Sequence, residues 1–389
     1  HYLHGTESEK YGVYFDNPRF DLPAAMKWKD RVVTTLVKGV AYQMKRHHVE
    51  VKKENARLLE AGKVEAGGNV YEGKNIILAT GSSSAVPPIP GADSGAVCTS
   101  REILKIETMP KSLAVIGGGV IGTEFASFFS SFGIEVHVIE MMDEILPFMD
   151  AELAGMLRKE MKDRVSFHLG CKVEKIEGGT LTFSSDAGTE QLNAETILMA
   201  VGRSPNVADM GFEQLGLDFS KRGITVNEQM KTNLPGVYAV GDVTGESLLA
   251  HSAYRMGEVA VNTIAGKRDR MRYHAVPWVV YSIPEGAGVG YTEARAANEG
   301  LAVKTATLQM RANGRFLAEN AGKNGICKVL VDAEKETLLG VHMLGGVSSE
   351  IIYGAAAMIE AELRVKDMRE IIFPHPTVSE IIKDTLWEL

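Results

Sequence analysis

The chain has 389 residues, with 42 Lys+Arg against 50 Asp+Glu, and therefore a formal net charge of −8. Its apolar fraction of 45% and charged fraction of 24% are ordinary for a globular protein and exclude a disordered chain. The acidic balance argues against nucleic acid or an anionic membrane as the main partner, because phosphates need a positive surface. The length predicts two or three domains.

Cysteine is sparse, and Cys98, Cys171 and Cys327 form no closely spaced pair. This pattern predicts neither a secreted disulfide framework nor a zinc site, and it favours a reducing compartment. No stretch of about 18 uninterrupted apolar residues is present, so we expect no transmembrane helix. The sequence opens on His1 instead of Met, which predicts a natural start upstream.

The first long element is an amphipathic helix over 22–44, whose apolar residues recur at helical spacing and which ends in basic residues. Strand-like stretches follow and end in an apolar strand at 75–81. The proline-rich linker 86–91 cannot continue a helix or a central strand.

The segment 113–140 has the pattern of a βαβ unit. An apolar strand over 113–116 leads into a glycine turn, phenylalanines recur at helical spacing up to Gly133, and a second strand covers 135–140. This order predicts a parallel sheet. Asp150 is expected to cap the next helix, whose apolar residues continue to Met161.

Apolar strands that end at a glycine recur at 76–81 and 197–202, so we predict two nucleotide-binding domains. A third such strand, 236–242, ends in an acid, and a helix is expected over 250–264. From Tyr273 the pattern changes to strands, hairpins and then helices over 349–363 and 377–387, which predicts a separate α+β domain.

The strongest motif is Gly117-x-Gly119-x-x-Gly122, between a strand and a helix. Its glycines permit a tight turn, close approach of a pyrophosphate and close helix–strand packing, and the pyrophosphate would lie at the helix N-terminus. Glu140 ends the next strand 21 residues after Gly119, near the spacing of about 20 expected for a ribose-binding acid. Glu140 therefore favours NAD over NADP. For the glycine motif as a whole, the alternative to dinucleotide binding is a glycine turn in a buried βαβ unit.

Two acidic residues have both a functional and a structural interpretation. Asp242 ends a predicted parallel strand, where ligands bind in open α/β sheets, but it could equally be a turn or cap aspartate. Glu380 can form a capping box with Thr377, or it can orient His375 for proton exchange near neutral pH. Prolines on both sides of His375 predict a stiff, extended loop.

Taken together, these residues resemble the flavoprotein disulfide reductases (class I pyridine nucleotide-disulfide oxidoreductases), and within them the branch that oxidises dihydrolipoamide. The matching pieces follow the family's order and cover nearly the whole sequence; they are 79–82, 117–124, 200–203, 238–243, 249–251 and 375–380. The resemblance implies an α/β fold with two Rossmann-like domains and a C-terminal α+β dimerisation domain. It assigns 1–108 and 236–272 to a FAD-binding domain, 109–235 to an inserted NAD-binding domain, and 273–389 to dimerisation.

The resemblance also implies roles for individual residues. Gly81 and Asp242 would contact FAD, and Ala250, at a helix start, would lie near the isoalloxazine ring. The remaining cofactor-binding residues, with Glu124 near the nicotinamide of NAD, would be Gly117, Gly119, Val120, Ile121, Gly122, Glu124, Glu140, Val173, Ala200, Gly202 and Arg203. No metal ligand is expected.

His375, oriented by Glu380, would be the catalytic acid–base partner of a dithiol. In this family the histidine reaches the partner subunit's redox centre, so the resemblance implies an active homodimer. The His375–Pro376 peptide bond is often cis in relatives.

The sequence departs from the family in one respect, because it has neither a first glycine-rich FAD loop nor a Cys-x-x-x-x-Cys pair. We expect it to be an incomplete chain of an active enzyme. That enzyme would reoxidise protein-bound dihydrolipoamide with NAD⁺, through a redox disulfide and FAD. Its partners would be lipoyl domains of 2-oxo acid dehydrogenase complexes or the glycine cleavage system, in the cytoplasm or mitochondrial matrix. The alternatives are an NAD(P)H-dependent glutathione-type reductase or an inactive, truncated nucleotide-binding protein.

Overall fold

The computed structural model describes residues 2–320 and 322–389. By its internal contacts the chain divides into two compact units. Unit 1 comprises residues 1–20, 86–202 and 273–389, and unit 2 comprises 21–85 and 203–272. Unit 2 is thus built from two separate segments, with residues 86–202 inserted between them in the sequence.

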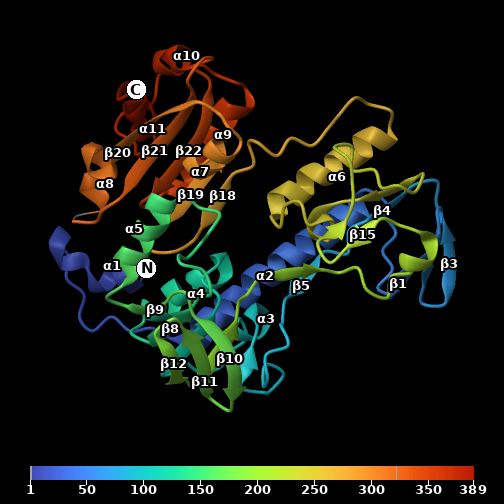
Figure 1. Cartoon of the computed structure of the whole chain (residues 1–389), viewed down its shortest axis with the longest axis horizontal. Helices are drawn as coiled ribbons and strands as arrows, with labels where there is room; N and C mark the ends of the chain where they lie inside the picture. The colour runs from blue at the N-terminus through green and yellow to red at the C-terminus, as the bar shows by residue number, and fades with distance from the viewer. Residues whose placement is uncertain (1, 321) are drawn as a thin grey trace. The chain divides into compact units, whose positions relative to one another are not determined.

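Unit 1 contains a five-stranded parallel sheet in the order β6-β13-β7-β8-β9. Its strands are Val97–Cys98, Thr196–Met199, Ser112–Ile116, Glu135–Ile139 and Val165–His168. Strands β8 and β9 of this sheet are labelled in Figure 1. The associated helices are α3 (Ser100–Ile103), α4 (Val120–Ser130) and α5 (Ala151–Met161). An antiparallel sheet of β10 (Lys172–Glu177), β11 (Thr180–Ser185) and β12 (Gly188–Asn193) follows. The βαβ prediction and the Asp150 cap are confirmed, since Asp150 accepts a hydrogen bond from the Glu152 N–H.

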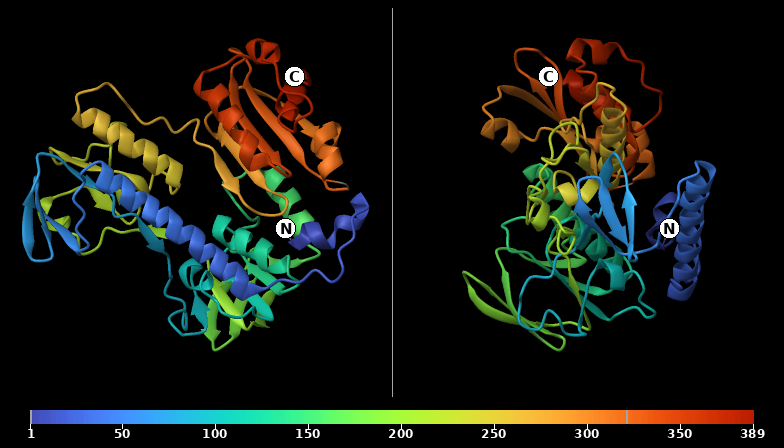
Figure 2. Two further views of the ribbon diagram at one scale, coloured as in Figure 1. Left: turned by 180° about the vertical axis from the view of Figure 1, so that it is seen from behind. Right: turned by 90° about the vertical axis from the view of Figure 1, so that its right-hand side faces the viewer.

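The C-terminal part of unit 1 is a five-stranded antiparallel sheet in the order β18-β19-β22-β21-β20, visible in Figures 1 and 2. Its strands are Trp278–Val280, Gly286–Gly290, Leu338–Leu344, Ile326–Asp332 and Val303–Gln309. Helices α9 (Ser348–Glu360) and α11 (Glu380–Trp387) pack against this sheet. Along β21, Cys327, Val329 and Val331 join the core with these helices, whereas Ile326 joins the core of the parallel sheet. The sheet is therefore buried on both faces.

Five shorter helices and two 3₁₀ turns complete unit 1. They are α1 (Tyr2–Thr6), η1 (Ser8–Tyr11), α7 (Glu293–Asn298), η4 (Met310–Ala312), α8 (Gly314–Glu319), α10 (Val365–Glu370) and α3 above. The described residues of the whole chain contain no helix with both the length and the hydropathy needed to cross a membrane.

Unit 2 joins short strands from its two segments. β4 (Ile76–Leu78) pairs in parallel with β17 (Val237–Ala239), and β5 (Ser82–Ser84) pairs with β14 (Arg203–Pro205). The other elements are α2 (Leu22–Arg46), β1 (Ala56–Glu60), β2 (Lys63–Ala66), β3 (Asn69–Glu72), η2 (Glu213–Leu215), β15 (Phe219–Ser220), β16 (Gly223–Ile224), η3 (Gly241–Thr244) and α6 (Ala250–Ile264). The helix predicted over 250–264 has the observed bounds of α6.

By their contacts, residues 86–108 fall in unit 1 and residues 203–235 fall in unit 2. Hydrophobic periodicity identifies a strand but does not say which sheet it joins, and β6 and β14 pair with distant strands. Helix α2 forms as predicted, yet its apolar face, including Leu36 at 65% exposed, is open in the described structure.

A histidine pair lies on adjacent strands β8 and β9. His137 Nδ1 is 3.1 Å from His168 Nε2, and the other ring nitrogen of His137 is 3.2 Å from Glu135 Oε1. Burial, followed by the proximity of His137, lowers the pKa of His168, while Glu190 acts in the opposite direction.

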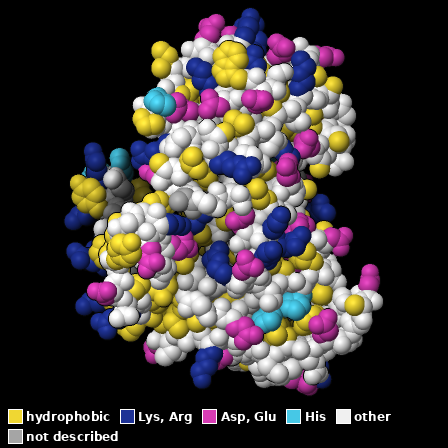
Figure 3. Space-filling view, turned by 90° about the vertical axis from the view of Figure 1, so that its left-hand side faces the viewer, with side chains coloured by type: hydrophobic (Ala, Val, Ile, Leu, Met, Phe, Trp, Pro, Cys, Tyr) yellow, Lys and Arg dark blue, Asp and Glu magenta, His cyan; other side chains and the backbone are white. Residues whose placement is uncertain are grey.

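On the face shown in Figure 3, basic and acidic side chains are interspersed.

We expect acid to destabilise the protein through His168. A lowered folded-state pKa means that the unfolded state takes up the proton first, so stability falls as the pH drops below about 6.5. The effect of His168 is under about 1 kcal/mol because the ring is only partly buried. The thermal midpoint of His168→Asn should depend less on pH between 7.5 and 5.5 than that of the wild type. His47→Asn, at an exposed helix end, should keep the wild-type dependence, and an unchanged dependence in His168→Asn would contradict the prediction.

Candidate functional site

The glycine turn between β7 and α4 has the geometry that the motif predicts. Gly117 has φ +105°, and a Cβ there would lie 2.6 Å from the Ala200 carbonyl oxygen. A Cβ on Gly122 would lie 2.0 Å from the Gly117 carbonyl oxygen, so the helix packs directly on the turn. A Cβ on Gly119 would meet no described atom within 4 Å, which leaves this residue's surface open to a ligand.

The N-terminus of α4 faces this opening, and no carboxylate in the first turn of the helix would compete with a bound anion. Gly119 is the N-cap and provides no side-chain hydrogen bond, and the first turn contains no acidic residue. The free N–H groups and the helix dipole can therefore attract a pyrophosphate. The turn satisfies the steric and electrostatic requirements of a dinucleotide.

Glu140 lies at the same edge of the sheet. Its Oε2 accepts a hydrogen bond from the Gly118 N–H at 2.5 Å, and its Oε1 accepts one from the Met142 N–H at 2.8 Å. These bonds hold the carboxylate against the glycine turn, with further lone pairs available to hydroxyl groups. The structure thus brings together the glycines, Glu140 and Ala200, which the sequence assigned to one site.

Replacing Glu140 should change coenzyme preference. We expect Glu140→Ala to lose the charged hydrogen bond to a ribose that the sequence predicts, about 1.5–3 kcal/mol, which corresponds to about 10- to 100-fold in kcat/KM for NADH. The repulsion of a 2′-phosphate disappears as well, so the ratio of NADH to NADPH activity should fall. Glu177→Ala, at an exposed position of β10, is the matched control and should keep the ratio. An unchanged ratio in Glu140→Ala would remove Glu140 from ribose recognition.

Glu124, on α4, is held by a different part of unit 1. Its Oε1 accepts a hydrogen bond from the Tyr281 N–H at 2.8 Å. Burial raises the pKa of Glu124, and the Tyr281 N–H opposes this effect. Val173 lies on β10 in a buried cluster with Ile116 and Ile139 and contributes packing.

Unit 2 assembles a second polar cluster from its two segments. The Ser82 hydroxyl donates to Asp242 Oδ2 at 2.5 Å and accepts from Arg203 Nε at 2.7 Å. Arg203 Nη2 also donates to the Ser82 carbonyl at 2.6 Å. Arg203 therefore lies with Asp242, although the two are 39 positions apart in the sequence. Ser82 was not among the predicted site residues, although it ends the matching piece 79–82.

Two backbone features beside this cluster fit a bound flavin. Gly81 has φ +68° and no described atom within 4 Å of an added Cβ. Helix α6 begins at Ala250 with Leu249 as an N-cap that provides no side-chain bond, and its first turn is free of acids. Its N–H groups and dipole therefore favour negative charge on a reduced ring.

His375 and Glu380 form the third cluster. His375 Nδ1 is 3.0 Å from Glu380 Oε1, and 82% of the histidine side chain is exposed. The Thr377 N–H donates to Glu380 Oε2 at 2.9 Å, and this bond, followed by the one to His375, lowers the pKa of Glu380. The His375–Pro376 bond is cis.

The capping box predicted at Thr377 is present only in part. Its hydroxyl bonds to the Pro374 carbonyl and to Ser379 instead of the helix, and α11 begins at Glu380. The Glu380 side chain therefore makes both predicted contacts: it accepts a hydrogen bond from the Thr377 N–H, and it lies within hydrogen-bond distance of His375.

The three cysteines are free. Burial raises the pKa of Cys98 to about 11 and that of Cys327 to about 12, so both are protonated thiols at neutral pH. Among the described residues no group of three or more His, Cys, Asp or Glu side chains is placed to hold a metal.

Comparison with known proteins gives a family. Residues 4–257 match "Pyridine nucleotide-disulphide oxidoreductase", and residues 276–386 match the dimerisation domain of the same name. The chain belongs to the pyridine nucleotide-disulphide oxidoreductase family. Its predicted fold class is thereby confirmed, and the dimerisation domain supports the predicted homodimer.

Named relatives of this disulphide oxidoreductase cover nearly all of the chain. It is 34% identical to dihydrolipoyl dehydrogenase of Bacillus subtilis and 39% identical to that of Thermus scotoductus; each match covers 98% of this chain and 83% of the relative. It is also similar to the solved structure of the HOCl-induced flavoprotein disulfide reductase RclA from Escherichia coli. That match has a TM-score of 0.86 and 28% identity and covers 95% of this chain and 86% of the other. The cofactors expected from the sequence, FAD and NAD, are those of this family.

Proposed function

We propose that this oxidoreductase is a dihydrolipoyl dehydrogenase, which oxidises protein-bound dihydrolipoamide with NAD⁺ through a redox disulfide and FAD. Two relatives with this name match 98% of the chain. The observation that carries the chemical proposal is the exposed His375 imidazole, 3.0 Å from an ionised carboxylate. Such an imidazole can meet a dithiol at the surface and accept its proton.

In the proposed reaction, Glu380 fixes the ring so that His375 takes the thiol proton through Nε2. The resulting thiolate is the reactive species in disulfide exchange. FAD, when bound, relays the two electrons to the nicotinamide. The described free cysteines are not the redox pair.

The two nucleotide-binding clusters have separate roles in this proposal. The α4 N-terminus, which has no acid in its first turn, and the turn from Gly117 to Gly122 would hold the pyrophosphate of NAD, and Glu140 would hold its ribose. Gly202 and Val173 would complete the NAD site, with Glu124 on the nicotinamide side. Asp242, Arg203 and the α6 N-terminus would hold FAD. The ranges expected for the three domains remain part of the same proposal.

The biological partners follow from the substrate. We propose lipoyl domains of a 2-oxo acid dehydrogenase complex or of the glycine cleavage system, in the cytoplasm or the mitochondrial matrix. His375 would act on the redox centre of the second subunit, so turnover would require the dimer.

A paired assay tests the proposal on the purified flavoprotein with its redox disulfide intact. We expect dihydrolipoamide to reduce NAD⁺, with growth of the 340 nm absorbance, and only slow turnover of glutathione disulfide with NADPH. The reverse preference would favour a glutathione-type reductase. A dimer-sized protein with no flavin absorbance and no turnover of either substrate would favour the non-enzymatic alternative.

A further inference from the structure

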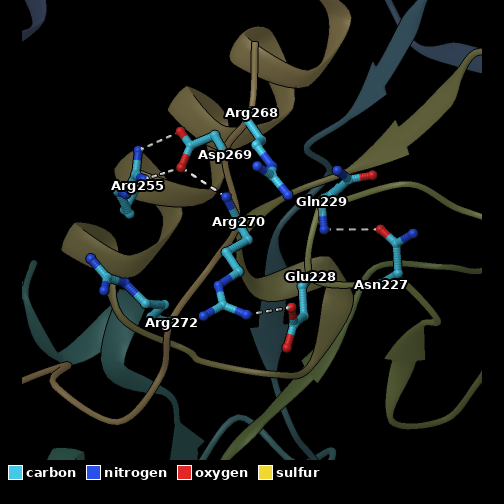
Figure 4. Close-up of a pocket in the computed structure, with 8 residues that line it drawn as sticks. All are labelled: Asn227, Glu228, Gln229, Arg255, Arg268, Asp269, Arg270 and Arg272. Carbon is cyan, nitrogen blue, oxygen red and sulfur yellow. Dashed lines mark hydrogen bonds and ion pairs between the residues drawn. The ribbon is translucent and has the colours of Figure 1, made fainter. Parts of the chain in front are cut away.

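Unit 2 contains a basic hollow that is separate from Asp242, Arg203 and the first turn of α6. Its volume is about 790 Å³, within the range of about 300–1,000 Å³ common for small-molecule pockets. Figure 4 shows its lining, which comes from the middle of α6, from the extended segment after that helix and from a turn before β17. The lining residues are Asn227, Glu228, Gln229, Arg255, Arg268, Asp269, Arg270 and Arg272.

One arginine of the hollow is fixed in place. Arg255 donates to both oxygens of Asp269, at 2.5 and 3.0 Å, and Asn262 donates to the same carboxylate at 2.8 Å. The Arg255 guanidinium holds the pKa of Asp269 down to about 2, so this carboxylate stays ionised and engaged. Asp269 therefore neutralises Arg255 and anchors the segment that follows α6.

The segment after α6 exposes two arginines of its own. The Asp269 carboxylate is bonded to Arg255 and Asn262. Met271 is buried, and its N–H donates to the Glu228 carbonyl at 2.7 Å. Arg268 and Arg270, at alternating positions, are exposed. Within the described ranges Arg268 has no ion-pair partner, and Arg270 has only a distant one, Glu228 at 3.7 Å.

The charge of the hollow is opposite to that of the chain. The four arginines face the carboxylates of Glu228 and Asp269 and that of Glu258, which lies 3.1 Å from Arg255, so a formal charge of +1 remains in a chain of −8. The lining contains no aromatic or aliphatic side chain, so it offers nothing to an apolar ligand body. Planar guanidinium groups match the paired oxygens of phosphates.

We propose that this hollow binds a compact di- or triphosphate group, held by Arg268 and Arg270 with Gln229 as a neutral donor. The phosphates can belong to a free polyphosphate or to a nucleotide, because the lining recognises only the anionic chain. The site does not depend on the proposed dehydrogenase activity.

Calorimetric titration with tripolyphosphate tests the site, with NADH present at saturation to block the glycine turn of unit 1. We expect one saturable site per chain, with an affinity that falls as the salt concentration rises. Arg268→Gln/Arg270→Gln should weaken binding about 100-fold, or roughly tenfold for each lost charged contact. Lys221→Gln/Arg222→Gln removes two exposed charges from a turn of the same unit and should bind as the wild type does.

Parallel titrations with ATP distinguish a nucleotide from free polyphosphate, since tighter binding of ATP would assign the phosphates to a nucleotide. Arg268→Lys/Arg270→Lys keeps the charge and loses the guanidinium forks, so it should bind more weakly than the wild type and more tightly than the glutamine variant. Absence of saturable binding, or equal loss in the Lys221/Arg222 control, would overturn the proposal. Binding of poly-aspartate at this site without tripolyphosphate would overturn it in favour of an acidic protein segment.

Discussion

His375→Gln should lower the rate of dihydrolipoamide oxidation about 100- to 10,000-fold, the usual contribution of a general acid–base group. Glutamine cannot accept the thiol proton, so the reactive thiolate is no longer favoured. The His375 side chain is 82% exposed, so the substitution should leave the fold intact. Steady-state turnover of dihydrolipoamide with NAD⁺ measures the effect.

A second activity separates a chemical role for His375 from a general defect. Transfer of electrons from NADH to an artificial acceptor such as ferricyanide does not need a thiol proton, and it should be unchanged in His375→Gln. Glu380→Gln should reduce dithiol turnover less, because the base remains while its orientation weakens. His47→Gln is the control at an exposed site. Normal dihydrolipoamide turnover in His375→Gln would exclude this residue from the mechanism.

Lys328→Met should destabilise unit 1 by about 3–5 kcal/mol, the cost of removing one partner from a buried ion pair. The Lys328 side chain is 5% exposed, and its Nζ lies 3.0 Å from Asp150 Oδ1, 2.7 Å from Glu152 Oε2 and 2.8 Å from Glu293 Oε2. Burial opposes the charge, but the carboxylates outweigh it and raise the pKa of Lys328. Without the ammonium, Asp150 is left buried beside two other acids.

Denaturant unfolding monitored by tryptophan fluorescence gives the size of this effect. Lys304→Met, on the neighbouring strand β20, removes an exposed lysine 3.6 Å from Glu336 and should cost less than about 1 kcal/mol. Adding Asp150→Asn to Lys328→Met should recover part of the loss, because the unpaired charge disappears. Equal stability of the two lysine variants would show that the buried pair contributes little.

Local sequence signals predicted the elements whose determinants are local. The Asp150 cap, the bounds of α6 and the turn at Gly117 and Gly122 depend on residues within a few positions of one another, and the structure confirms them. The start of α11 was misplaced by three residues, because the Thr377 hydroxyl bonds to its neighbours instead of capping the helix.

Contacts between distant segments could not be predicted in the same way. Lys328 and Asp150 are 178 positions apart, and the cap signal at Asp150 does not indicate Lys328 as its partner. Ser82 joins Arg203 and Asp242 only because β5 pairs with β14. The basic run at 267–272 is visible in the sequence, but the hollow exists only because the turn at 227–229 lies against it.

The most direct test is hydrogen–deuterium exchange of the protein with and without NADH. Since the pyrophosphate would occupy the free N–H groups at the start of α4, saturating NADH should slow exchange in peptides that cover 117–123 and 139–142. NADPH at the same concentration should protect them less. Protection confined to other parts of the chain, with these two segments exchanging as in the free protein, would contradict the account.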